Sequence, residues 1–136
     1  MAIASIAAIL YAIVMFGVVA FQIALAAGAP WGAYAMGGGA PGQFPPVLRI
    51  GAVIQAVLLA GMAAVILARA GLILHGWSRV THWLVWIVVA LTAFSLVLNL
   101  ITPSAGERAI WAPTLAVLLL SSLIVAFCSS SATSAT

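Results

Sequence analysis

Few side chains in this sequence are able to do chemistry, and the only carboxylate among them is Glu107. The 136 residues include four basic residues, all of them Arg, one acidic residue and two His. A single carboxylate cannot form the acid–base pair that glycosidase-type hydrolysis requires. The sequence also contains no nucleophile–base pair and no phosphate-binding loop. We therefore do not predict an enzyme.

Glu107 is expected to act as a structural charge at the start of a helix. Its neighbour Arg108 is a poor partner, because adjacent residues on a helix point about 100° apart. Arg49 introduces another apolar segment on the same side of the protein and is the better partner. A Glu at a helix start also complements the positive end of the helix dipole. The sequence therefore predicts an interhelical ion pair between Glu107 and Arg49.

Three amide side chains interrupt the apolar segments, and each is close to the side on which Glu107 lies. They are Gln22, Gln55 and Asn99. The preferred interpretation is a set of interhelical hydrogen bonds, each worth about 0.6 kcal/mol on average. The alternative is a small polar chamber for a ligand, headgroup or ion, closed by the loop that carries Trp31 and Tyr34. Without a carboxylate inside an apolar segment, proton-coupled or sodium-coupled transport is not expected.

His75 and His82 are the residues that could ligate a metal or haem. Gly76 makes one continuous helix through both unfavourable. Histidines beside Trp side chains at this position are more typical of the aromatic belt at a membrane interface. The lone Cys128 has no second Cys to pair with. We predict no metal and no cofactor.

The elements that position these residues are membrane-spanning helices. Hydrophobic residues make up 67% of the chain and charged residues 4%, whereas soluble proteins carry about 25% charged residues. A spanning helix needs roughly 20 apolar residues. Alternating patterns typical of a transmembrane barrel are absent. The sequence predicts one all-α domain over residues 1–136, a membrane four-helix bundle with spans at about residues 4–27, 47–68, 82–101 and 110–128.

Four spans place both termini on one side of the membrane, together with the connection between the second and third spans. That connection carries Arg69 and Arg79, whereas Arg49, Glu107 and Arg108 give the opposite side a net charge of +1. Positive residues are enriched on the cytoplasmic side. We therefore expect cytoplasmic termini. The scattered Arg residues form no basic stripe, so nucleic acid is not an expected partner.

The first connection, Gly28–Pro46, combines many Gly and Pro residues with aromatic side chains such as Trp31 and Phe44. Gly and Pro at this density exclude a continuous helix, and the aromatic residues distinguish the segment from a flexible linker. We predict an ordered loop that caps one end of the bundle. A re-entrant loop is the alternative, provided that its backbone is buried in protein or lines water.

The second span carries a ridge of small residues that recur every four positions. Such ridges allow close helix packing in lipid. The ridge is expected to pack within the chain, with a homo-oligomer seam as the alternative. Its members are Ala52, Ala56, Ala60, Ala64 and Ala68. The last residues, 129–136, are small and polar, and we expect a frayed tail there.

Several short motifs resemble those of a broad family of small four-span bacterial membrane proteins. The resemblance covers nearly the whole chain and combines a Pro-Trp-Gly loop with a later Glu-Arg-x-x-Trp-x-Pro pattern. It implies the four-span architecture and a multi-pass protein of the cell inner membrane, and it implies no activity. The matching residues are Pro30-Trp31-Gly32, Gly37-Gly38, Pro45-Pro46, Arg49, Asn99, Pro103, Glu107-Arg108, Trp111 and Pro113.

Two functions remain open on this evidence. The preferred one is a structural or accessory membrane subunit, which contacts the lipid bilayer and other membrane chains or copies of itself through its helices. The alternative is a small transporter, channel or lipophilic-ligand binder that uses the polar chamber. It would involve Gln22, Gln55 and Asn99, and it requires these three side chains to face one cavity.

Overall fold

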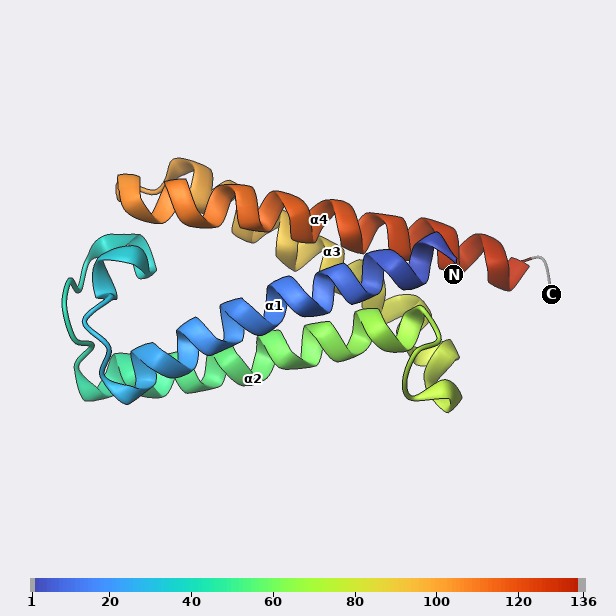
Figure 1. The fold of residues 1–136 in the computed structure, drawn as a ribbon, viewed down its shortest axis with the longest axis horizontal. Helices are drawn as coiled ribbons and strands as arrows, with labels where there is room; N and C mark the ends of the chain where they lie inside the picture. Colours follow the sequence, from blue (N-terminus) through green and yellow to red (C-terminus); the bar gives the residue numbers. More distant parts are fainter. Residues whose placement is uncertain (1, 135–136) are drawn as a thin grey trace.

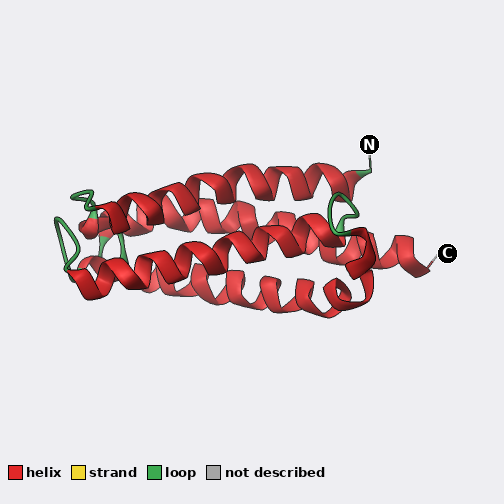
Figure 2. Ribbon diagram, turned by 90° about the horizontal axis from the view of Figure 1, so that it is seen from below, coloured by secondary structure: helices red, strands yellow, loops and turns green. Residues whose placement is uncertain are grey.

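The computed structural model describes residues 2–134, and side chains as far as Ser129. The protein is an all-α four-helix bundle (Figures 1 and 2), and the described residues contain no strand. Its long helices are α1 (Ile3–Ala27), α2 (Pro46–Arg69), α3 (Ser78–Ile101) and α4 (Ala105–Ser134). All four are long and apolar enough to cross a membrane. The predicted fold class is confirmed.

Helix ends follow from local sequence. α1 stops where Gly28 adopts φ 106°, a left-handed conformation that glycine accepts readily and that closes helices. α2 begins at Pro46, in the first helical turn where a missing N–H costs no helix hydrogen bond. Ser104 precedes α4, and its Oγ accepts a hydrogen bond from the backbone N–H of Glu107 at 3.2 Å.

The expected and observed spans differ most in the last helix. α4 begins at Ala105 instead of about residue 110, because Ser104 supplies an N-cap there. It also continues to Ser134, through most of the segment expected to be a frayed tail. Ser129 is buried in this extension. Residues 135–136 of the expected tail lie outside the described residues.

The helices form two hairpins, α1–α2 and α3–α4, joined near the termini. α1 packs extensively on both α2 and α4, whereas α2 and α3 share a smaller contact. Both termini lie at one end, and the two hairpins diverge toward the other end (Figure 1). The main core contains Tyr11, Met15, Val85 and Leu118. A second, smaller cluster around Leu25, Phe44 and Ala52 lies where the first hairpin meets the loop.

Two short 3-10 helices, η1 (Gly32–Tyr34) and η2 (Met36–Gly38), lie within the first connection. They occupy the space between the diverging hairpins (Figure 1). We call residues 28–45 the cap loop. The indole Nε1 of Trp111 donates a hydrogen bond to the carbonyl of Tyr34 at 2.7 Å, and the Ser104 hydroxyl donates to the carbonyl of Ala33 at 2.9 Å. The predicted ordered cap is confirmed.

Candidate functional site

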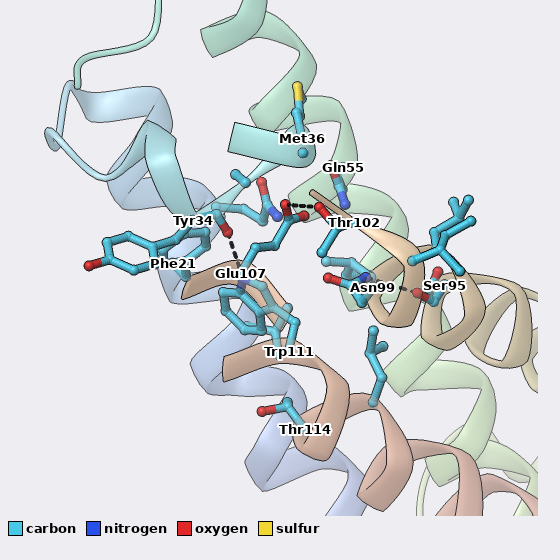
Figure 3. A pocket seen from close by; sticks show the side chains of 18 of the residues that line it. Phe21, Tyr34, Met36, Gln55, Ser95, Asn99, Thr102, Glu107, Trp111 and Thr114 are labelled. Atoms are coloured by element: carbon cyan, nitrogen blue, oxygen red, sulfur yellow. Dashed lines mark hydrogen bonds between the residues drawn. The ribbon is translucent and has the colours of Figure 1, made fainter. Parts of the chain in front are cut away.

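A cavity of about 540 Å³ lies beneath the cap loop, between the two hairpins. All four long helices contribute to its wall, and η1, η2 and the turn before α4 close its end (Figure 3). We call this cavity the chamber. It is lined by Val18, Phe21, Gln22, Tyr34, Ala35, Met36, Gly37, Gln55, Leu59, Ser95, Leu98, Asn99, Ile101, Thr102, Pro103, Glu107, Trp111, Thr114 and Leu115.

The three amides meet the condition that the chamber alternative set for them, that of lining one cavity. Gln22 from α1, Gln55 from α2 and Asn99 from α3 all line the chamber, and Glu107 joins them from α4. The sequence analysis places Glu107 at the mouth of a span, and the structure has it in the first turn of α4. Its side chain lines the chamber, with 8% of the residue exposed.

Gln22 is the most deeply placed of the amides. It lies on the buried stripe of α1, three residues before Leu25 and seven after Met15, and it is 7% exposed. Within the part of the chain that the structure describes, its amide makes no hydrogen bond. Buried polar groups in folded proteins nearly always have a partner. Gln22 lines the chamber without a hydrogen-bond partner in the described chain, so its amide is available to bind a polar group there.

Asn99 lines the chamber and has a buried acceptor without a partner. Its amide nitrogen donates to the carbonyl of Ser95 at 2.8 Å, while its Oδ1 is buried without a partner. A carbonyl only accepts hydrogen bonds, so the NH₂ group must point toward Ser95 and the oxygen must point the other way. Figure 3 shows Asn99 and Ser95 on the α3 side of the chamber, opposite Tyr34. The orphaned oxygen requires a donor that the described chain does not supply.

The Glu107 carboxylate is oriented by a network at the start of α4. The hydroxyl of Thr102 donates to Glu107 Oε2 at 2.9 Å. The same hydroxyl oxygen accepts from the backbone N–H of Ser104 at 3.3 Å. The S-x-x-E spacing of Ser104 and Glu107 is that of a capping box, but only the bond from the Glu107 N–H to Ser104 is direct, and Thr102 stands between the glutamate and the Ser104 N–H. This spacing was visible in the sequence, and it explains why Glu107 turns inward.

The predicted ion pair between Glu107 and Arg49 is not formed. Arg49 donates from Nε to the carbonyl of Phe44 at 2.8 Å, and its guanidinium lies against Gly28. It therefore holds the cap loop to the start of α2. Arg108 is exposed and donates to the carbonyl of Thr102 at 3.0 Å. Neither Arg lines the chamber.

Trp31 also lies outside the chamber. Its ring is stacked on Phe21, with centroids 6.0 Å apart, and Phe21 in turn meets Trp111 edge-on at 4.7 Å. The cap loop contributes Tyr34, which the chamber interpretation had named together with Trp31, and Met36, which it had not. Met36 adopts φ 50°, a left-handed conformation that costs an L-residue about 1–2 kcal/mol. The cap loop holds it there, at the chamber wall.

The chamber wall is more exposed on α2 and α3 than on α1 and α4. Its lining residues on those helices include Gln55, Leu98 and Ile101, all of which are exposed, whereas Gln22 and Glu107 on the opposite wall are buried. This follows the packing of the bundle, in which α2 and α3 meet over less surface than the other neighbouring helices. A molecule dissolved in the bilayer would meet a polar pocket behind an apolar entrance.

Other sequence candidates lie elsewhere. His75 and His82 are exposed near the termini, and His82 Nδ1 lies 3.5 Å from the Arg69 guanidinium. Among the described residues, no group of three or more His, Cys, Asp or Glu side chains could hold a metal. Cys128 is a free, half-buried thiol in α4.

The ridge of small residues on α2 is divided between two surroundings. Ala52, Ala56 and Ala68 are buried within the chain, Ala64 is half-buried, and Ala60 is exposed. The buried members allow α1 and α2 to approach closely. The expected use of the ridge in packing within the chain is therefore observed for most of its length.

The chain matches no protein-family model, no curated protein and no solved structure. The fold and the chamber define the class directly. This is a small membrane protein whose four apolar helices enclose, at one end, a chamber with mainly apolar walls and a few polar side chains.

Proposed function

We propose that this protein binds a small amphiphile, which enters the chamber from the lipid phase between α2 and α3. The observation that carries the proposal is Gln22, which is nine-tenths buried, lines the chamber and has no hydrogen-bond partner in the described chain. The Gln22 amide is therefore free to bind a polar headgroup in the chamber.

The dimensions and chemistry of the chamber support this proposal. Its volume of about 540 Å³ lies within the range of small-molecule sites, roughly 300–1,000 Å³. Such sites combine mainly apolar walls with a few convergent polar groups. Here Gln22, Asn99 and Glu107 are the polar groups, and Leu59 and Leu98 flank the entrance. The protein acts as a lipophilic-ligand binder or as the binding step of a small transporter.

The second candidate function is a structural or accessory subunit in a homo-oligomer or a larger membrane complex. Ala60 is exposed, and the neighbouring Gly61 has open space where a Cβ would lie. These two residues offer a site for close approach by another helix. The rest of the ridge is already used in packing α2 within the chain, so ligand binding is the better supported function.

We further propose that the protein belongs to the four-span bacterial family that its motifs resemble and lies in the inner membrane with cytoplasmic termini. Each end carries two Arg, and the basis for this orientation is that Glu107 lowers the net charge of the chamber end to +1. The chamber would then open near the outer surface. Maleimide labelling tests this in a Cys128→Ala background. Gln43→Cys should react with an impermeant reagent in intact cells and Gly76→Cys should not, and the reverse pattern would invert the orientation.

Native mass spectrometry of protein extracted from its own membrane tests ligand binding. Wild-type protein should carry one additional small molecule. Gln22→Leu, which removes the amide at similar size, should lose it. Gln43→Leu makes the same exchange in the exposed cap loop, away from the chamber, and should retain it. Equal retention by both variants, or wild-type protein with nothing bound, would refute the proposal.

A further inference from the structure

We infer that the group received by the chamber is a primary ammonium, held by the Glu107 carboxylate and the Asn99 amide oxygen. This inference rests on the proposed function and names the chemistry of its ligand. The ligand is an alkyl amine in the broad sense, with its ammonium in the chamber and its apolar chain between α2 and α3.

The carboxylate of Glu107 is the first reason. It is buried at the chamber wall, and within the described residues its side chain has one partner, the neutral hydroxyl of Thr102. The nearby cations are committed elsewhere, Arg49 to the Phe44 carbonyl and Arg108 to the Thr102 carbonyl. A buried charge is normally paired, so the missing cation is expected to come from the ligand.

The hydrogen-bonding polarity of the wall is the second reason. Asn99 offers an acceptor because its NH₂ group is bound to Ser95, and the carboxylate of Glu107 is an acceptor only. A ligand that matches both must donate hydrogen bonds. An ammonium carries three donors and a positive charge. A carboxylate or phosphate headgroup would instead place negative charge beside Glu107.

The aromatic walls are the third reason. Phe21 and Trp111 line the same chamber, as does Tyr34, whose hydroxyl points away from Glu107 and Asn99 (Figure 3). Aromatic rings attract cations to their faces, most strongly where water is excluded. Rings alone would suit a quaternary ammonium equally well. The donor requirement of Asn99 Oδ1 favours the primary form, because a quaternary nitrogen has no N–H.

The entrance accounts for the apolar part of the ligand. Leu59 on α2 and Leu98 and Ile101 on α3 line the chamber where it opens toward lipid. An alkyl chain at this position remains in contact with apolar surface while its head reaches Glu107. The same chemistry is available from two sources, the amine headgroup of a bilayer lipid and a free long-chain amine.

Binding of matched ten-carbon probes to purified protein in a non-ionic detergent tests the inference. The probes are decylamine, 1-decanol, decanoate and decyltrimethylammonium, and the readout is the concentration dependence of the thermal midpoint. Wild-type protein should prefer decylamine. Glu107→Gln should weaken decylamine about 10–100-fold, as expected for loss of a charge-assisted hydrogen bond, and should leave 1-decanol unchanged.

Two further variants separate binding from folding. Arg79→Gln removes one charge at the opposite end of the bundle and should bind decylamine like wild type. Adding Gln55→Glu to Glu107→Gln returns a carboxylate to another wall of the chamber and should restore part of the preference for decylamine. A double variant that folds yet shows no recovery would count against a role for the charge itself.

The outcomes distinguish this inference from the proposed function. If 1-decanol or decanoate binds wild-type protein as tightly as decylamine, the ammonium inference fails while ligand binding stands. The ammonium inference would also be overturned if sodium chloride raised the thermal midpoint more than choline chloride did and decylamine did not compete with the sodium ion. The site would then bind a metal cation. If no probe binds and no native ligand is retained, the proposed function itself fails.

Nanodiscs identify the source of the amine. Wild-type protein that retains phosphatidylethanolamine but not phosphatidylcholine, with the retention lost in Glu107→Gln, assigns the site to a lipid headgroup. Binding of decylamine without selective retention of the aminolipid assigns it to a free amine. Either result supports the ammonium inference. Equal retention of the two lipids by wild type and Glu107→Gln, with no binding of decylamine, contradicts it.

Discussion

Replacing Gly106 with Ala should loosen the cap loop, although Ala is the better helix former. Gly106 lies in the first turn of α4, beneath the ring of Tyr34. A Cβ added there would lie 2.7 Å from Tyr34 Cε1 and 3.0 Å from Cδ1. Carbon atoms prefer a separation of about 3.5–4.0 Å. The ring must therefore move by about 1 Å, away from the position in which it closes the chamber.

Two opposing terms set the magnitude. Exchange of Gly for Ala inside a helix stabilises it by about 0.5–1 kcal/mol. Overpacking a tight contact costs about 1–3 kcal/mol. Gly61 provides the matched control, because it is also helical and has nothing within 4 Å of its added Cβ. Gly61→Ala should stabilise the protein, and Gly106→Ala should be less stable than Gly61→Ala by about 1–3 kcal/mol.

Unfolding in SDS gives the free-energy difference, and hydrogen exchange locates it. The amides of η1 and η2 should exchange faster in Gly106→Ala than in Gly61→Ala, while those in the middle of α1 should be unaffected. If Gly106→Ala stabilises the protein as much as Gly61→Ala and leaves cap exchange unchanged, the contact with Tyr34 does not order the cap. The account of how the chamber is closed would then be wrong.

Three other changes have defined outcomes. Trp111→Phe removes the donor to the Tyr34 carbonyl and should destabilise the cap by about 1 kcal/mol, measured as faster hydrogen exchange in η1. Gly32→Ala places a methyl group against the backbone carbonyl of Ala40, elsewhere in the cap loop. The variant should therefore be cut within the cap loop by limited proteolysis under conditions in which wild type is not cut. Ala52→Leu overpacks a fully buried position and should cost about 1–3 kcal/mol in SDS unfolding, whereas the exposed Ala60→Leu should be neutral in a monomer. A change of oligomeric state on Ala60→Leu, seen by light scattering, would show that α2 mediates self-association.

The bundle and the convergence of its amides could be predicted because they follow from properties of single segments. Helix length and direction determine which residues share one end of a bundle, so Gln22, Gln55 and Asn99 were placed together without knowledge of the packing. The inward direction of Gln22 could also have been derived from α1 alone. It continues the alternating spacing of three and four residues set by Tyr11 and Met15.

The partners of the charged residues could not be predicted in the same way. Choosing Arg49 for Glu107 assumed that opposite charges at one end would meet. The structure satisfies both locally, Arg49 through the Phe44 carbonyl and Glu107 through Thr102. The outcome depends on the path of the cap loop, which its Gly and Pro residues leave open. That path also decides that Tyr34 closes the chamber and that Trp31 lies outside it.

The division of the bundle into two hairpins has a consequence for biogenesis. The first hairpin contributes Gln22 and Gln55, and the second contributes Asn99 and Glu107. Neither half can form the chamber alone, so the site comes into existence only after both hairpins are inserted and α4 has packed on α1. A molecule held there contacts both halves and stabilises their association in proportion to its occupancy. Occupancy of the chamber would thus report that membrane insertion and assembly are complete.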